Sequence, residues 1–374
     1  MNKYPGINGK TAVNNIRVIR LSDIYLIAAE AALKKSSADQ ASANKYLNAI
    51  IKRAIPSASD VTATEALVLK ERRKELVMEG HRFYDIMRLG IIGAGRVGTS
   101  FVLAMPSAVE GILCSTKEHT TQRAQSLKVK AYTDGAALLR NCDVLLLTVR
   151  DDVIGSVAAS LADSLTGADR RETCILHCSG AMDLSSLEPL SALGYSVGSL
   201  HPLQSFAAPS GDLLRHIYMA VDGDDRAKET ALFLVKALDS KPLFVPQEER
   251  VLYHAAACFC SNYVVTAVAL GQRLMRRWTE TDGEAAQSLM PLLKGTVGNL
   301  ERTDRWQKAL TGPVSRGDTG TVAKHLDAMP KELVGPYCAF SRAAGELSLE
   351  NGTITENQYE VLKQILAMAE GVHE

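Results

Sequence analysis

The stretch "LGIIGAGRVG", residues 89–98, constrains the fold more than any other part of the chain. A short apolar run leads into Gly93-x-Gly95-x-x-Gly98, and "RVGTSFVLAM" then reads as a helix. Gly93 permits a tight turn, Gly95 lets a pyrophosphate approach the backbone, and Gly98 allows close packing of helix on strand. The order strand, glycine loop, helix therefore predicts a dinucleotide-binding unit that begins at Leu89.

Further strands alternate with helices after this loop. They read "NCDVLLLTV", "ETCILHCSG", "YSVGSLHPLQSF", "HIYMAVDG" and "KPLFVP". Continuous apolar runs are typical of parallel strands that are buried on both faces. The alternation ends near residue 247. We expect an α/β fold with a Rossmann-like, mostly parallel sheet over 89–247, followed by an all-α domain over 248–374 and preceded by a helical segment over 1–88.

The residues after the second strand, "GILCS", indicate the cofactor. NAD-selective folds place an acidic side chain about 20 residues beyond the glycines, whereas this chain has two hydroxyls and a cation there. These groups suit a 2′-phosphate, so NADP is predicted; Glu118 leaves NAD open if the strand ends one residue later. Arg96 belongs to the pyrophosphate loop, and Val149 and Ser179 would flank the nicotinamide. The cofactor residues are thus Gly93, Gly95, Arg96, Val97, Ser115, Thr116, Lys117, Val149 and Ser179.

Two histidines end neighbouring strands. His177 and His201 should converge on the cofactor crevice, because ligands bind at the carboxyl ends of parallel strands. Each could equally be a structural residue. Cys178 suggests a nucleophile, but no ordered base is evident. A metal site at these three residues lacks paired ligand spacing, so no metal is expected.

The C-terminal region begins with "EERVLYHAAACFCSNYVVTAVALGQRLMRRW", which predicts the central helix of a bundle or of a dimer interface. His254, Cys258 and Asn262 recur every four residues and would share one face. Farther on, Arg316 could clamp a substrate carboxylate or pair with Asp318. The candidate catalytic residues are His201, His254, Asn262 and Arg316.

The first 88 residues predict three helices. The first has Ser22 or Asp23 as N-cap, the second spans 41–54 before Pro56, and the third starts where Thr62 and Glu65 have capping-box spacing. The expected apolar side of the first helix consists of Ile24, Ile27, Ala28, Ala31 and Leu33.

Two family resemblances divide the chain. "RLSDIYLIAAEAAL", "YLNAIIKRA" and "ERRKELVMEGHRFYDIMRLG" resemble the C-terminal part of the SusD/RagB-like outer-membrane glycan-binding proteins, over residues 4–90 only. This implies a fragment joined by fusion to a second protein.

The second resemblance covers 89–374. "IGAGRVG", "HCSGAMDLSSL", "GSLHPLQSF", "LYHAAACFCSNY" and "ALTGPVSRGDTGTVAKHL" are similar to a bacterial family of Rossmann-like NADP oxidoreductases with a helical C-terminal domain of unknown function. Its architecture is similar to pyrroline-carboxylate reductases and 3-hydroxyacid dehydrogenases. The latter pair a Lys with the Asn of the central helix; here His254 stands eight residues before Asn262 instead.

The composition limits which classes of partner are expected. Lys+Arg and Asp+Glu are 42 each, so no net charge favours nucleic acid or an anionic membrane. No run of about 18 uninterrupted apolar residues is present. Seven cysteines, an odd number, indicate a reducing, cytoplasmic protein rather than a disulfide framework. The apolar stretch 251–271 predicts a homodimer.

These observations predict an NADP-dependent oxidoreductase that transfers a hydride to or from a small carbonyl, imine or hydroxy acid. Two alternatives stay open at this point. One is a nucleotide-binding regulator or sensor without turnover, and the other is a glycan-binding remnant governed by residues 1–88.

Overall fold

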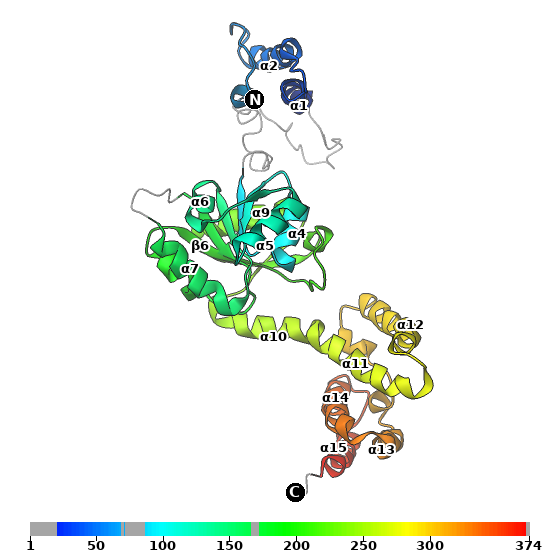
Figure 1. The fold of residues 1–374 in the computed structure, drawn as a ribbon. Coiled ribbons are helices and arrows are strands. Elements are labelled where there is room, and N and C mark those ends of the chain that lie inside the picture. The colour runs from blue at the N-terminus through cyan, green and yellow to red at the C-terminus, as the bar shows by residue number, and fades with distance from the viewer. Residues whose placement is uncertain (1–20, 69–70, 72–86, 166–171, 372–374) are drawn as a thin grey trace, which may run out of the picture. The chain divides into compact units, whose positions relative to one another are not determined.

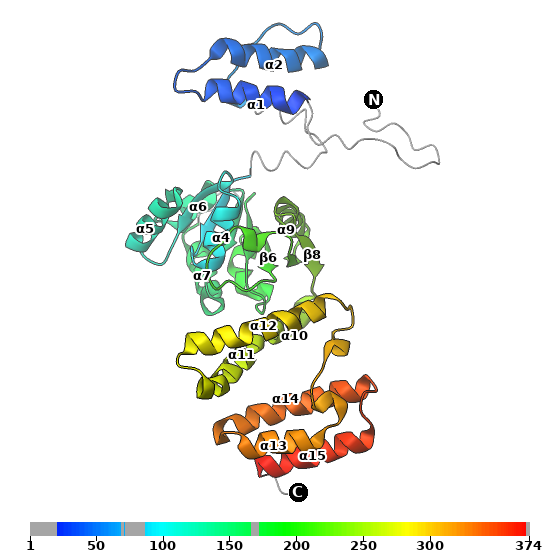
Figure 2. The ribbon, with the colours of Figure 1, turned by 90° about the vertical axis from the view of Figure 1, so that its right-hand side faces the viewer.

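The computed structural model describes residues 21–68, 71, 87–165 and 172–371. The chain forms two compact units, Met1–Ala256 and Ala257–Glu374. Figures 1 and 2 show the elements of both units.

A sheet of eight strands, counted within the described residues, is the centre of the first unit. It lies in the order β3-β2-β1-β4-β5-β6-β7-β8, and all neighbours are parallel except β6 and β7. The prediction of a mostly parallel, Rossmann-like sheet is confirmed; the two-residue strand β3 was not predicted. The strands are β1 (Leu89–Ile92), β2 (Val109–Leu113), β3 (Lys130–Ala131), β4 (Val144–Leu147), β5 (Cys174–His177), β6 (Ser196–Pro202), β7 (Tyr218–Gly223) and β8 (Lys241–Phe244).

Helices cover both faces of this sheet (Figure 1). One face carries α4 (Arg96–Ala104), α5 (Lys117–Leu127) and α9 (Asp225–Ala237). The other carries α6 (Gly135–Arg140), α7 (Ile154–Asp163) and α8 (Glu188–Ser191). Successive strand residues enter opposite cores: Ile91 packs with the α4 layer and Ile92 with the α6 layer. Burial on both faces explains the continuous apolar runs of these strands.

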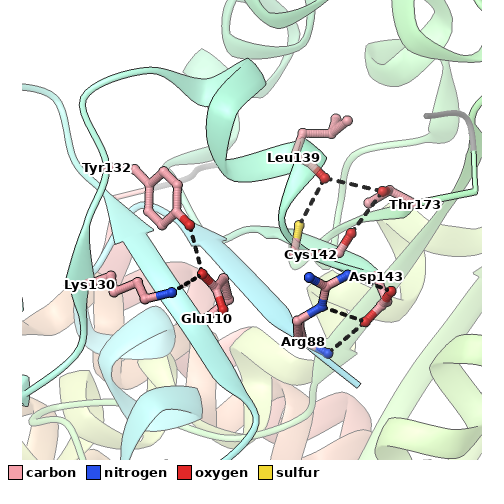
Figure 3. A network of polar contacts seen from close by, with 8 residues as sticks. All are labelled: Arg88, Glu110, Lys130, Tyr132, Leu139, Cys142, Asp143 and Thr173. Atoms are coloured by element: carbon pink, nitrogen blue, oxygen red, sulfur yellow. Dashed lines mark hydrogen bonds and ion pairs between the residues drawn. The ribbon is translucent and has the colours of Figure 1, made fainter. Parts of the chain in front are cut away.

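The join between the two family resemblances is anchored at the amino edge of the sheet (Figure 3). The Arg88 backbone N–H donates to Asp143 Oδ2 at 2.9 Å, and its guanidinium pairs with the same carboxylate at 3.4 Å. At the same edge Glu110 accepts hydrogen bonds from Lys130 and Tyr132, which joins β2 to β3 and the residue that follows it. Arg88 therefore belongs structurally to the sheet.

The first helices form a pair, α1 (Leu21–Leu33) with α2 (Gln40–Ala54). The predicted apolar side of α1 is wrong in three of its five residues: Ile24 and Ile27 are about half exposed, at 49% and 50%, and Ala31 is exposed. Ala28 is partly buried, and Leu33 packs against the core of the helix pair. The buried residues are Leu26, Ala29 and Ala32. Because α1 is apolar on more than one side, the contact with α2 selects which side is buried.

Most of the predicted third helix lies outside the described residues. At its start, Thr64 rather than Thr62 accepts the backbone N–H of Leu67, at 3.2 Å.

Consecutive helical segments run from Gln247 to Trp278, as expected. Ser261 interrupts them with non-helical dihedrals, between α10 (Arg250–Cys260) and α11 (Asn262–Met275). The predicted single helix is corrected to two, and the turn breaks the four-residue spacing of the predicted polar face. By length and composition this stretch could cross a membrane, with a mean hydropathy of 1.4.

The second unit continues with α12 (Asp282–Glu301), α13 (Thr319–Ala328), α14 (Lys331–Glu350) and α15 (Glu356–Glu370). Its small core is formed by α13, α14 and α15 around Val322, Cys338, Leu362 and Leu366. Thr355 and Gln358 form a capping box at the start of α15.

We expect a chain that begins at Met87 to fold and to bind NADPH within a few-fold of the full chain. Met87 is 4% exposed and packs in the α4 core, and Arg88 holds Asp143, so these two residues complete the sheet. A matched chain that begins at Leu89 lacks them and should melt at a lower temperature. Loss of folding or of NADPH binding in the Met87 chain would show that residues 1–86 are part of the functional unit.

Candidate functional site

The glycine loop is held against the end of β4. The Thr148 hydroxyl donates to the Gly93 carbonyl at 2.7 Å. Gly93 has φ +99°, and a Cβ there would lie 2.8 Å from Val149 Cγ1. A Cβ on Gly98 would lie 2.5 Å from Thr148 Oγ1. Both positions therefore require glycine, because any side chain would push the loop off the strand.

Gly95 is different, because a Cβ there would meet nothing within 4 Å. Gly95 is also the N-cap of α4, and no side chain caps this helix. Its first backbone N–H groups and its dipole thus face open space, which is the arrangement that binds a pyrophosphate. Exposed Arg96 donates to the Phe206 carbonyl at 3.4 Å. Val97 is partly buried, and its side chain packs against the core.

The three predicted 2′-phosphate residues lie together at the start of α5. Ser115, Thr116 and Lys117 are all exposed. The Thr116 hydroxyl caps α5 by accepting the His119 N–H at 3.1 Å. β2 ends at Leu113, so Glu118 lies within α5 and not at the strand end. This placement leaves Lys117 and the hydroxyls as the groups nearest the strand end.

Ser179 follows β5 and organises the turn after it. Its hydroxyl donates to Asp151 Oδ2 at 2.7 Å and accepts the N–H of Met182 at 3.0 Å. Asp151 itself comes shortly after β4, in the 3-10 turn Asp151–Val153. The pair joins the two loops at the carboxyl edge.

His177 is fully buried, and Cys178 is partly buried against the core. Burial, with the positive charge of Arg250, lowers the pKa of His177 to about 3, so its ring is neutral. Its Nδ1 accepts the Ser179 N–H at 3.2 Å. Burial also raises the pKa of the Cys178 thiol to about 12, which makes it a poor nucleophile. Within the described residues no group of metal-ligating side chains is found.

His201 and His254, two of the candidate catalytic residues, lie close together. Their ring centroids are 6.3 Å apart, and a Cβ on Gly180 would lie 2.8 Å from both rings. His201 Nδ1 is 2.8 Å from the Tyr253 hydroxyl. Burial, then the charges of Arg250 and His254, lower the pKa of His201 to about 4.

Arg250 lies beneath this group and is 1% exposed. Its Nη1 donates to Ser199 Oγ at 2.9 Å and its Nη2 to the Ser179 carbonyl at 2.7 Å. Arg250 therefore ties β6 to the turn after β5. Among the described residues no carboxylate pairs with it, because the oxygens it contacts are a hydroxyl and a carbonyl.

Asn262 and Arg316 belong to the second unit, and their contribution to this site stays a prediction. Asn262 begins α11, and Arg316 ends the 3-10 turn Val314–Arg316; both are exposed. Asp318 caps α13 by accepting the N–H and the hydroxyl of Thr321, at 3.0 and 2.7 Å. Asp318 is thus the N-cap of α13.

Sequence reasoning missed Arg250 and Tyr253. Both stand in "EERVLYH", where residues 250, 253 and 254 have the spacing of one helix face. That spacing was the available signal. Their partners, Ser199 and His201, lie about fifty positions earlier, so only the fold shows the contacts.

Both family resemblances are confirmed by comparison with known families. Residues 2–143 match the SusD family, beyond the expected limit of residue 90 and across the first strands of the sheet. Residues 217–344 match a family described as a domain of unknown function, DUF2520. No curated protein matches this sequence.

Solved structures show a shared fold. A Bacteroides fragilis protein, provisionally named an NADP oxidoreductase, matches at TM-score 0.57 and 20% identity, over 70% of this chain and 99% of its own. A Thermotoga maritima protein matches at TM-score 0.54 and 22% identity, over the same 70% and 99%. A pyrroline carboxylate reductase from Plasmodium falciparum, solved with NADP bound, has a TM-score of 0.46 at 13% identity, over 78% and 99%.

Proposed function

We propose that this chain is an NADP-dependent oxidoreductase that transfers a hydride to or from a small carbonyl, imine or hydroxy acid. The observation that carries the proposal is the glycine loop. At Gly93 and Gly98 the protein's own atoms occupy the space where a Cβ would lie. Gly95 and the uncapped start of α4, in contrast, face open space. NADPH would supply the hydride when bound. The fold shared with the provisionally named NADP oxidoreductase supports the same assignment.

The residues present fit this cofactor. The α4 N-terminus and Arg96 would hold the pyrophosphate, and Ser115, Thr116 and Lys117 the 2′-phosphate. Val149 and the turn at Ser179 would bound the nicotinamide. On the substrate side we assign His201 and His254. A substrate contact of Asn262 or Arg316 stays a prediction.

The test is NADPH oxidation across a panel of small carbonyls and imines. Consumption of NADPH with any of them supports an enzyme. NADPH binding without oxidation across the whole panel would favour the alternative, a nucleotide-responsive regulator. We also propose a cytoplasmic location, since the seven cysteines are all free thiols.

We expect NADPH to bind at least about tenfold more tightly than NADH. Lys117→Glu should remove or reverse this preference, because a carboxylate repels the 2′-phosphate and accepts hydrogen bonds from a free ribose hydroxyl. Lys128→Glu is the matched control, since Lys128 is exposed at the other end of the same helix. Fluorescence titration measures both affinities, and equal affinities in the wild type would contradict the assignment.

We further propose a homodimer through the apolar helices. Val251, Leu252, Phe259 and Val265 are 67–71% exposed, and each side chain left in water forgoes about 1.5–3 kcal/mol. A groove of about 380 Å³ between α11 and α14 offers a further apolar surface. A second copy would cover these faces.

Sedimentation of the full chain at micromolar concentration should give the mass of a dimer. Phe259→Glu should shift the measured mass toward that of a monomer. Glu248→Lys is the control, because Glu248 is exposed at a polar position in the turn before α10. A monomeric wild type, or a protein soluble only in detergent, would overturn the dimer.

A further inference from the structure

Tyr253 and His201 make a direct contact at the carboxyl end of β6. The Tyr253 hydroxyl lies 2.8 Å from His201 Nδ1, and the two rings are perpendicular with centroids 5.6 Å apart. Among the described residues, this is the hydrogen bond that His201 makes, and its Nε2 makes none. His201 is partly buried, and among the described residues its Nε2 is not one of the fully buried polar atoms that lack a partner. Of the two ring nitrogens, Nε2 is therefore the one left for a ligand.

Both partners of this contact are neutral at physiological pH. The groups that face His201 are Arg250, His254 and His177, and none of them is an acid. Burial, and then Arg250 and His254, hold the pKa of His201 at about 4, and burial raises the pKa of Tyr253 to about 12. A protonated phenol can donate to an unprotonated Nδ1, and in that arrangement the ring proton lies on Nε2.

Arg250 holds this arrangement without touching a ligand. It is fully buried, and its two hydrogen bonds join Ser199 of β6 to the Ser179 turn. Its charge disfavours a second positive charge on His201 and stabilises a negative charge on Tyr253. Asp222, Asp151 and Asp183 act on it only from a distance.

We propose that Tyr253 and His201 form a proton-donating pair for the reduction proposed above, with His201 as the catalytic residue and Arg250 as its positioning residue. The inference rests on the proposed function. The substrate carbon receives a hydride, with its electron pair, from NADPH, and the C=O or C=N π pair moves to the heteroatom. That atom takes the Nε2 proton while Nδ1 takes the phenol proton. His201 stays neutral, Tyr253 becomes a phenolate beside Arg250, and water returns the proton after release.

The test is long-range ¹H–¹⁵N correlation on the full chain labelled at histidine, with His201→Gln to assign the signal. We expect His201 to be the neutral Nε2–H tautomer from pH 7 to pH 5, whereas an ordinary histidine is half protonated near 6.5. Tyr253→Phe should leave the fold intact and shift the Nδ1 signal toward a mixture of tautomers. Tyr218→Phe, at an exposed tyrosine of β7, is the control and should change nothing.

The role of Arg250 is tested by variants that remove or keep its positive charge. Arg250→Gln should raise the pKa of His201 by about one unit or more, and Arg250→Lys should keep it low. If Arg250→Gln does not fold, the lysine and Tyr253 variants still decide. A wild-type His201 that titrates near 6.5, or a tautomer unchanged by Tyr253→Phe, overturns the pair. NADPH titrated into the same samples separates the two proposals: binding with an ordinary His201 overturns the pair alone, and no binding overturns the proposed function and the pair with it.

Discussion

The close approach of the glycine loop to the end of β4 is the contact on which the site depends. Thr148 reaches the Gly93 carbonyl, and neither Gly93 nor Gly98 has room for a Cβ. This contact fixes where α4 begins, and hence where its uncapped N–H groups point. A loosened loop would leave the sheet intact and remove the anion site.

The second feature of the site is a buried charge without a contacting carboxylate. Removing a guanidinium from water costs several kcal/mol unless its hydrogen bonds are satisfied. Arg250 satisfies two of them with Ser199 and the Ser179 carbonyl, and in doing so joins the ends of two parallel strands. Burial, and then the same charge, lowers the pKa of His177 and of His201 and keeps both rings neutral. Arg250 therefore contributes to both the geometry and the protonation at this edge.

The sequence alone predicted those features that depend on residues close to one another in the chain. The glycine loop could be predicted because each glycine meets a structural requirement set within a few residues. The strands could be predicted because burial on both faces leaves a continuous apolar run. The buried side of α1 could not be predicted, because Leu26 or Ile24 is chosen by a partner helix. The contacts of Arg250 and Tyr253 could not be predicted either, since their partners lie about fifty residues away in the sequence. Met87 and Arg88 likewise looked like the end of one segment, although their contacts belong to the next.

NADPH binding to the wild type and to Gly95→Ala tests the central claim most directly. A methyl group at Gly95 meets no atom of the described residues within 4 Å, so the variant should fold and melt as the wild type does. It would stand where the pyrophosphate must approach the backbone. The account predicts saturable NADPH binding by the wild type and binding weaker by about tenfold or more in Gly95→Ala. Equal binding by both, or no binding by the wild type, would contradict it.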